Sequence, residues 1–123
     1  MAQGNRKMRP FRARAQVRHQ PGMNKTEALY AQILELRKRA GEILEWAFEP
    51  EKFRLADNTF YCPDFRIVMA DLSVEFHEVK AKWSNGQVGL DDAKVKIKVA
   101  AEMHPYRFLV AVCDRGRWEL KEI

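Results

Sequence analysis

Residues 60–83 read FYCPDFRIVMADLSVEFHEVKAKW, and this stretch decides the fold that the sequence predicts. Two runs rich in apolar and β-branched residues flank the segment ADLS at positions 70–73. Such a pattern is typical of a β-hairpin with a short connection. We expect its first strand to begin at Thr59 or Phe60, and the second to run toward Trp83.

Charged residues interrupt this otherwise apolar hairpin. Asp64 follows Pro63 in the first run, and Glu78 and Lys80 stand near the end of the second. Residues two apart in a strand point to the same face, so Glu78 and Lys80 should share one. Charged side chains seldom occupy central strands unless they are paired or bind a metal. We therefore expect Asp64, Glu78 and Lys80 to converge on one spot.

Length and composition predict one domain in a reducing compartment. The chain has 123 residues and two cysteines, Cys62 and Cys113, which form no disulfide framework. No apolar run is long enough to cross a membrane, and the basic N-terminus lacks the apolar segment of a secretory signal. We expect a cytoplasmic protein, or one of the host cytoplasm if a phage encodes it.

The positive charge is concentrated at the N-terminus. Residues 1–22 contain six basic residues and no acid, which leaves 22 − 6 = 16 basic and 17 acidic residues for the remainder. The basic residues of this arm are Arg6, Lys7, Arg9, Arg12, Arg14 and Arg18. A basic arm ahead of a near-neutral domain, here residues 23–123, is a common footprint of nucleic-acid binding. A solvated leader is the alternative.

A first helix is expected from Lys25 to Ala40, ending at Gly41. Asn24 can cap it, and Glu27 stands three residues later, as a capping box requires. Apolar residues follow at helical spacing, at Leu29, Ile33, Leu36 and Ala40, with Tyr30 and Leu34 beside them. Glu27 lies on the flank of this stripe, where a capping role competes with a role as an acidic group at the site.

The other segments predict a mixed α/β core. We expect strands over 43–48, 52–55, 106–113 and 117–123, a turn at 57–58 and a flexible loop over 84–89. A second helix should be capped by Asp91 or Asp92 and run to about Met103. Alternation over 94–99 also fits a strand, but the cap signals and a helical row of apolar residues favour the helix.

The order of the motifs resembles the PD-(D/E)xK nuclease superfamily. The motifs are NKTE at 24–27 opening a helix, FYCPDF at 60–65 and EVKAKW at 78–83. More narrowly, the chain is similar to small phage-encoded endonucleases of the junction-resolvase type over roughly four-fifths of its length. This resemblance implies a restriction-endonuclease-like mixed sheet flanked by helices and a homodimer that cuts branched DNA such as Holliday junctions. Ala81 departs from the glycine that related proteins often have there.

The resemblance also implies the roles of individual residues. Asp64, Glu78, the backbone carbonyl of Val79 and Glu27 would hold Mg²⁺, for which Mn²⁺ can substitute. Magnesium binds oxygen ligands and lowers the pKa of water, which phosphodiester hydrolysis needs. Lys80 would hold the attacking water or stabilise the charged transition state.

Several cations are candidates for contacts with DNA phosphates. Besides the arm, these are Lys82, Lys94 and Lys98. Lys94 and Lys98 lie one helical turn apart, although a solvated face explains them as well. Trp83 can stack on an unpaired base near a branch point, but a core or interface position is the simpler interpretation.

Two alternatives accompany the nuclease hypothesis. The chain can be an inactive nuclease scaffold that binds DNA or a protein partner, with Lys80 in a plain salt bridge to Asp64 or Glu78. It can also cut another DNA substrate, such as a nick or a mismatch. His77 should point away from Glu78, and this argues against a zinc site.

Overall fold

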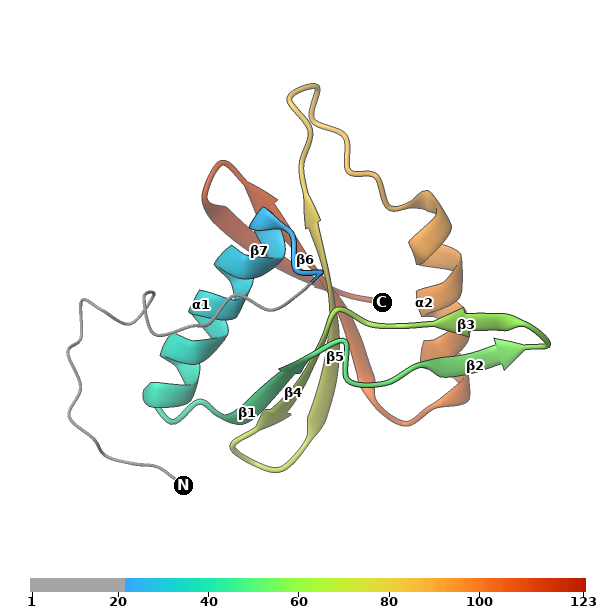
Figure 1. The fold of residues 1–123 in the computed structure, drawn as a ribbon, viewed down its shortest axis with the longest axis horizontal. Helices are drawn as coiled ribbons and strands as arrows, with labels where there is room; N and C mark the ends of the chain where they lie inside the picture. The colour runs from blue at the N-terminus through green and yellow to red at the C-terminus, as the bar shows by residue number, and fades with distance from the viewer. Residues whose placement is uncertain (1–21) are drawn as a thin grey trace.

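A mixed five-stranded sheet forms the centre of the protein. The computed structural model describes residues 22–123, so the predicted basic arm lies outside the described residues except for Gly22. The elements are α1 (Lys25–Arg39), β1 (Ile43–Phe48), β2 (Phe53–Ala56), β3 (Thr59–Tyr61), β4 (Phe65–Met69), β5 (Val74–Ala81), α2 (Asp91–Met103), β6 (Arg107–Asp114) and β7 (Arg117–Glu122). The sheet order is β1-β4-β5-β6-β7, with α1 on one face and α2 on the other (Figure 1).

Strand β5 lies at the centre of this sheet. It pairs antiparallel with β4 and parallel with β6. A parallel pair needs a long crossover, and α2 supplies it. β7 returns antiparallel at the edge through a turn in which Arg115 and Gly116 both have positive φ, as a type I′ hairpin turn requires. The predicted mixed α/β fold class is confirmed.

The predicted hairpin is present, but it begins later than the sequence suggested. β4 starts at Phe65, and residues 59–61 instead pair with β2 as a separate two-stranded sheet. Pro63 explains the break, because proline lacks the amide hydrogen that a continuing ladder needs. Asp64 therefore stands directly before β4 and not inside a strand.

Helix α1 has its predicted ends but packs by a different face. Asn24 and Glu27 form both hydrogen bonds of a capping box, and Gly41 follows the helix with φ +84°. The buried residues of α1 are Glu27, Tyr30, Ala31 and Leu34. The predicted stripe through Leu29 and Leu36 is wrong, since each is 47% exposed. The helix thus buries the face that carries Glu27.

The second layer combines α2 with the β2–β3 hairpin. Ile97 and Ala100 of α2 pack with a cluster of aromatic residues, namely Phe53, Tyr61, Phe76 and Phe108. The bounds of α2 match the prediction, but its cap does not. The N-cap is Leu90, which makes no side-chain cap bond, and the two aspartates lie in the first turn, where the helix dipole favours them.

Neither helix in residues 22–123 combines the length and apolarity that crossing a bilayer requires.

The burial of α1 is testable with two leucines of the same helix. Leu34 is fully buried, so Leu34→Ala should lower the free energy of unfolding by about 2–5 kcal/mol in urea denaturation. Leu29→Ala removes the same atoms from the exposed face and should change it by no more than about 0.5 kcal/mol. Equal destabilisation at both positions would contradict the observed packing.

Candidate active site

The site lies directly before the start of β4. Phe65, the first residue of β4, pairs with His77 of β5, so Val79 lies beyond the last β4 partner. The carboxylate of Asp64 takes the place of that partner: its Oδ2 accepts a hydrogen bond of 2.8 Å from the Val79 amide. The side chain that the sequence singled out thus also completes the hydrogen bonding of β5.

Glu78 lies on the α2 face of the sheet, between a tyrosine and a lysine. The Tyr61 hydroxyl donates a 2.9 Å hydrogen bond to Oε1, and the Lys80 Nζ lies 3.4 Å from Oε2. Glu78 and Lys80 are two residues apart and share a face, as predicted. Glu78 is 7% exposed, whereas the Lys80 side chain is 31% exposed and can reach a substrate in solvent.

Glu27 joins the site from α1. Its Oε1 accepts a 2.8 Å hydrogen bond from the Asn24 amide, and the residue is 8% exposed. Burial is the main cause of the raised pKa of Asp64 and of Glu78, and the charge of Glu27 adds to both shifts. Glu27 therefore caps the helix and contributes negative charge to the site, although the sequence had set these roles in competition.

The electrostatics of the site favour a bound cation. Burial and, after it, the neighbouring charge of Glu78 raise the pKa of Asp64 to about 8, against the opposing effects of the Val79 hydrogen bond and Lys80. Burial also raises the pKa of Glu78, while Tyr61 and Lys80 oppose that shift. Lys80 is the one cation in residues 22–123 that pairs directly with these carboxylates. One ammonium would not balance three ionised carboxylates, and the raised pKa of Asp64 reflects the cost of ionising all three without a cation.

The available ligands fit magnesium, which needs few protein ligands, better than a metal that is held by many side chains. Within residues 22–123, no three His, Cys, Asp or Glu side chains form a ready metal cluster. Magnesium, however, is usually held by one or two carboxylates and keeps several waters. The N–H and C=O of one strand residue face the same neighbouring strand, so the Val79 carbonyl should also face the gap before the start of β4. Asp64, Glu78 and this carbonyl are suitable ligands.

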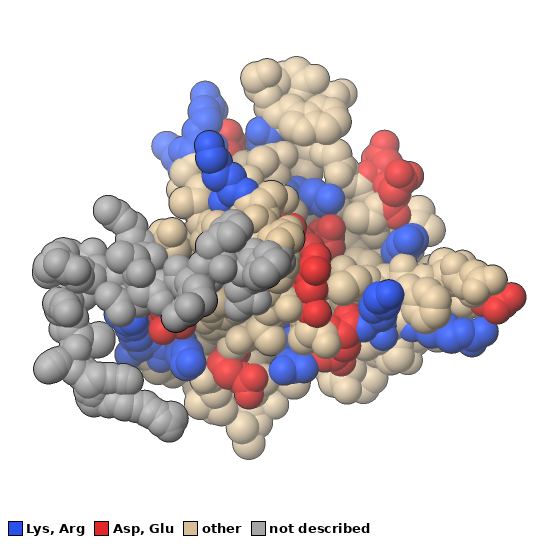
Figure 2. Space-filling view, in the orientation of Figure 1, with Lys and Arg blue, Asp and Glu red and all other residues tan. Residues whose placement is uncertain are grey.

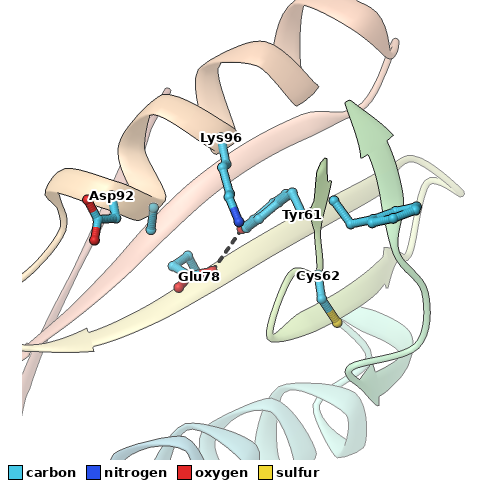
Figure 3. Close-up of a pocket in the computed structure, with 7 residues that line it drawn as sticks. Tyr61, Cys62, Glu78, Asp92 and Lys96 are labelled. Carbon is cyan, nitrogen blue, oxygen red and sulfur yellow. Dashed lines mark hydrogen bonds between the residues drawn. The ribbon is translucent and has the colours of Figure 1, made fainter. Parts of the chain in front are cut away.

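A pocket of about 270 Å³ adjoins Glu78 and contains two residues that the sequence analysis missed. It is lined by Phe60, Tyr61, Cys62, Glu78, Asp92, Ala93 and Lys96. Figure 3 shows Lys96 extending from α2 toward Tyr61 and its hydrogen bond to Glu78. Lys96 is two residues from Lys94 in α2, so the two side chains leave the helix in nearly opposite directions. Helical phase could therefore have separated Lys96 from Lys94. Nothing in the sequence pairs Tyr61 with Glu78.

The predicted phosphate contacts are dispersed. Lys94 and Lys98 are exposed on α2 but do not line the pocket. The Nζ atom of Lys82 lies 3.6 Å from Oδ2 of Asp114, in an ion pair. The arginines and lysine of the arm fall outside the described residues. Figure 2 shows acidic side chains through the middle of one face, with basic side chains on both sides of them. Such a surface suits an anionic polymer that is bound at its flanks around a cation-holding centre.

His77 lies on the opposite face of β5, as predicted. Its ring nitrogens contact the Tyr30 hydroxyl at 2.7 Å and Glu75 at 2.9 Å, and Arg107 reaches Glu75 at 3.0 Å. Burial lowers the pKa of His77. These four residues fix β5 against α1 and do not contribute ligands to the site.

No protein-family model, curated protein or solved structure matches this chain significantly.

The raised pKa of Asp64 predicts a pH-dependent stability in EDTA. An ordinary aspartate has a pKa near ~4, so between about pH 4 and 8 the folded state holds a proton that the unfolded state has released. Wild-type stability should then fall with rising pH by up to about 1.4 kcal/mol per unit, relative to Asp64→Asn. Urea denaturation across this range measures the difference. Asp57→Asn, at an exposed turn, should follow the wild type, and parallel curves for all three proteins would refute the raised pKa.

Proposed function

We propose that this protein is a magnesium-dependent endodeoxyribonuclease that hydrolyses phosphodiester bonds in branched DNA. The observation that carries the proposal is the position of Asp64 and Glu78, with the single lysine Lys80, where β4 starts and β5 ends, within reach of the charge of Glu27. Buried carboxylates that repel one another indicate a site that binds a cation. A partly exposed lysine beside them matches the need of phosphoryl chemistry for a positive group near the reacting phosphate.

The roles of the residues follow from their positions. Bound Mg²⁺ would neutralise phosphate charge and lower the pKa of a coordinated water. Asp64, Glu78 and the Val79 carbonyl would hold the ion, and Glu27 would orient water or add a ligand. Lys80 would donate hydrogen bonds to the attacking water or to the phosphate oxygens as their charge develops. Tyr61 positions Glu78 through the 2.9 Å hydrogen bond.

The arrangement of elements supports a restriction-endonuclease-like fold. A helix carrying an acid precedes an antiparallel pair, β4–β5, whose adjoining ends carry the PD and ExK residues. β5 then pairs parallel with β6 after the α2 crossover. Resolving a four-way junction takes two symmetric cuts, so we propose a homodimer with one site in each subunit. We propose a cytoplasmic location, which is the host cytoplasm if a phage encodes the protein.

Cleavage assays test the proposal directly. With Mg²⁺, the wild type should nick a labelled four-way junction faster than a linear duplex of the same sequence, and EDTA should stop the reaction. Asp64→Asn and Lys80→Ala should each lower the rate at least about 100-fold, because each removes a ligand or a charge from the transition state. Binding of the junction in EDTA should persist in both variants.

Lys121→Ala is the matched control, since it removes an exposed lysine from β7. It should cut at the wild-type rate. If no DNA is nicked with any divalent ion, and calorimetry finds no Mg²⁺ binding, the chain is an inactive scaffold that binds DNA or a protein. Equal rates of cutting for junction and duplex would support nuclease activity but contradict a preference for branched DNA.

The arm is testable by salt dependence. For duplex DNA, removing one phosphate contact should reduce the slope of log affinity against log salt by about 0.9. Deleting residues 1–22, with their six basic residues, should therefore weaken DNA binding and flatten this slope. Fluorescence anisotropy over a series of salt concentrations measures it. An unchanged slope would show that the arm makes no phosphate contacts.

A further inference from the structure

Trp83 stands out at the tip that follows β5. Its side chain is 56% exposed, although a tryptophan is usually buried to a large extent. The loop after β5 projects beyond the end of that strand in Figure 1. The other two tryptophans of the chain are engaged in the fold: Trp46 donates a hydrogen bond to Glu35, and Trp118 packs on Tyr30. Trp83 is thus the tryptophan available to a partner.

The loop holds the indole ring in a defined place. The Trp83 amide donates to the Gln87 carbonyl at 2.7 Å, and the Gly86 amide donates to the Trp83 carbonyl at 2.9 Å. Lys82 and Val88 form an isolated β-bridge across the base of the loop. The turn is therefore hydrogen-bonded on both sides of Trp83, which lowers the entropic cost when a ligand binds the ring.

Gly89 provides the support for the ring. A Cβ atom at this position would lie 2.8 Å from Cζ2 of Trp83, which is closer than real contacts allow. The indole therefore packs directly against the backbone of Gly89, and only glycine leaves the room it needs. More than half of the surface of Trp83 nevertheless remains exposed. A supported ring with an open surface is the form of a stacking platform.

The position of this ring relates it to the proposed site. Trp83 follows Lys80 by three residues, so the two Cα atoms are at most about 10 Å apart. This limit corresponds to about three steps of 3.4 Å along a DNA strand. The loop segment 84–87 reads SNGQ and carries no acid, and Lys82 adjoins the ring in sequence. A DNA strand that enters the site can therefore pass the ring without charge repulsion from the loop.

We propose that Trp83 stacks on an unpaired base of the DNA substrate, close to the phosphate that is cut. The inference rests on the proposed function and specifies how the site selects branched DNA. A duplex keeps its bases stacked on one another, whereas a branch point, fork or gap offers a free base face. Stacking on an aromatic residue needs no particular base, which suits recognition of shape over sequence.

A protein partner fits this tip less well. A stable protein interface buries about 800 Å² on each side and involves some 20–30 residues. Residues 83–89 offer one exposed large apolar side chain, Trp83, among small and polar residues. A single ring of this kind matches a single base.

Tryptophan fluorescence tests the inference separately from cleavage. The probes are a fork with unpaired oligo-dT arms and a fully paired duplex, both in EDTA so that neither is cut. Fork binding should quench wild-type emission, and the quenching should be absent in Trp83→Leu because Trp46 and Trp118 lie within the fold. By anisotropy, Trp83→Leu should bind the fork about 10-fold more weakly and bind the duplex as the wild type does.

Two further variants sharpen the test. Gly89→Ala keeps the indole but displaces it, so it should also weaken fork binding about 10-fold with an unchanged circular-dichroism spectrum. Leu72→Ala truncates an exposed apolar residue at the β4–β5 connection, 72% exposed, and should leave both affinities unchanged. Agreement of Gly89→Ala with Trp83→Leu would support a role for the position of the ring.

Several outcomes would overturn the inference. In the first, Trp83→Leu binds the fork and is quenched as the wild type is. In the second, Trp83→Leu weakens binding of fork and duplex equally. In the third, Trp83→Leu changes the oligomeric state in sedimentation, which would assign Trp83 to a protein interface. The proposed function fails by different results. If the wild type cuts DNA in a Lys80-dependent manner while Trp83 is silent, only the stacking role falls. If Trp83 responds to the fork but no DNA is ever cut, only the nuclease falls.

Discussion

The hydrogen bond from the Val79 amide to the Asp64 carboxylate is the interaction on which the site depends. It exists because Pro63 stops the preceding strand and β4 begins only at Phe65, which leaves an amide of β5 without a strand partner. One carboxylate then both completes the sheet and turns negative charge toward Glu78 and Glu27. Fold and site are thus built from one feature, and a substitution at Asp64 acts on both.

Burying these carboxylates together destabilises the folded chain, and the surrounding contacts offset only part of that effect. Tyr61 and Lys80 favour ionised Glu78, and Asn24 holds Glu27, but the pKa of Asp64 is still raised to about 8. A purely structural cluster would gain from replacing one acid by a neutral group. The presence of these acids together is explained if a divalent ion offsets their repulsion when they ionise, which is the basis of the proposed function.

Local sequence patterns predicted most of the helices and strands, but they did not predict which side chains pack together. Strand parity placed Glu78 and Lys80 on one face, and the capping box fixed the start of α1, because both are properties of neighbouring residues. The buried face of α1 was missed, since Leu29 and Leu36 looked as suitable as Tyr30 and Leu34, and only the sheet chooses between them. The hydrogen bond between Tyr61 and Glu78 joins two separate sheets, and no spacing in the sequence encodes it.

The alternation along β5 explains why its register must be fixed firmly. His77 and Val79 face α1, while Phe76, Glu78 and Lys80 face α2, so a slip of one residue would exchange the two sets. Glu78 would then enter the α1 core, and His77 would take its place in the site. The hydrogen bonds of His77 to Tyr30 and of Val79 to Asp64 both oppose such a slip. The hydrogen-bonded network of His77 thereby keeps Glu78 and Lys80 on the α2 side of the strand.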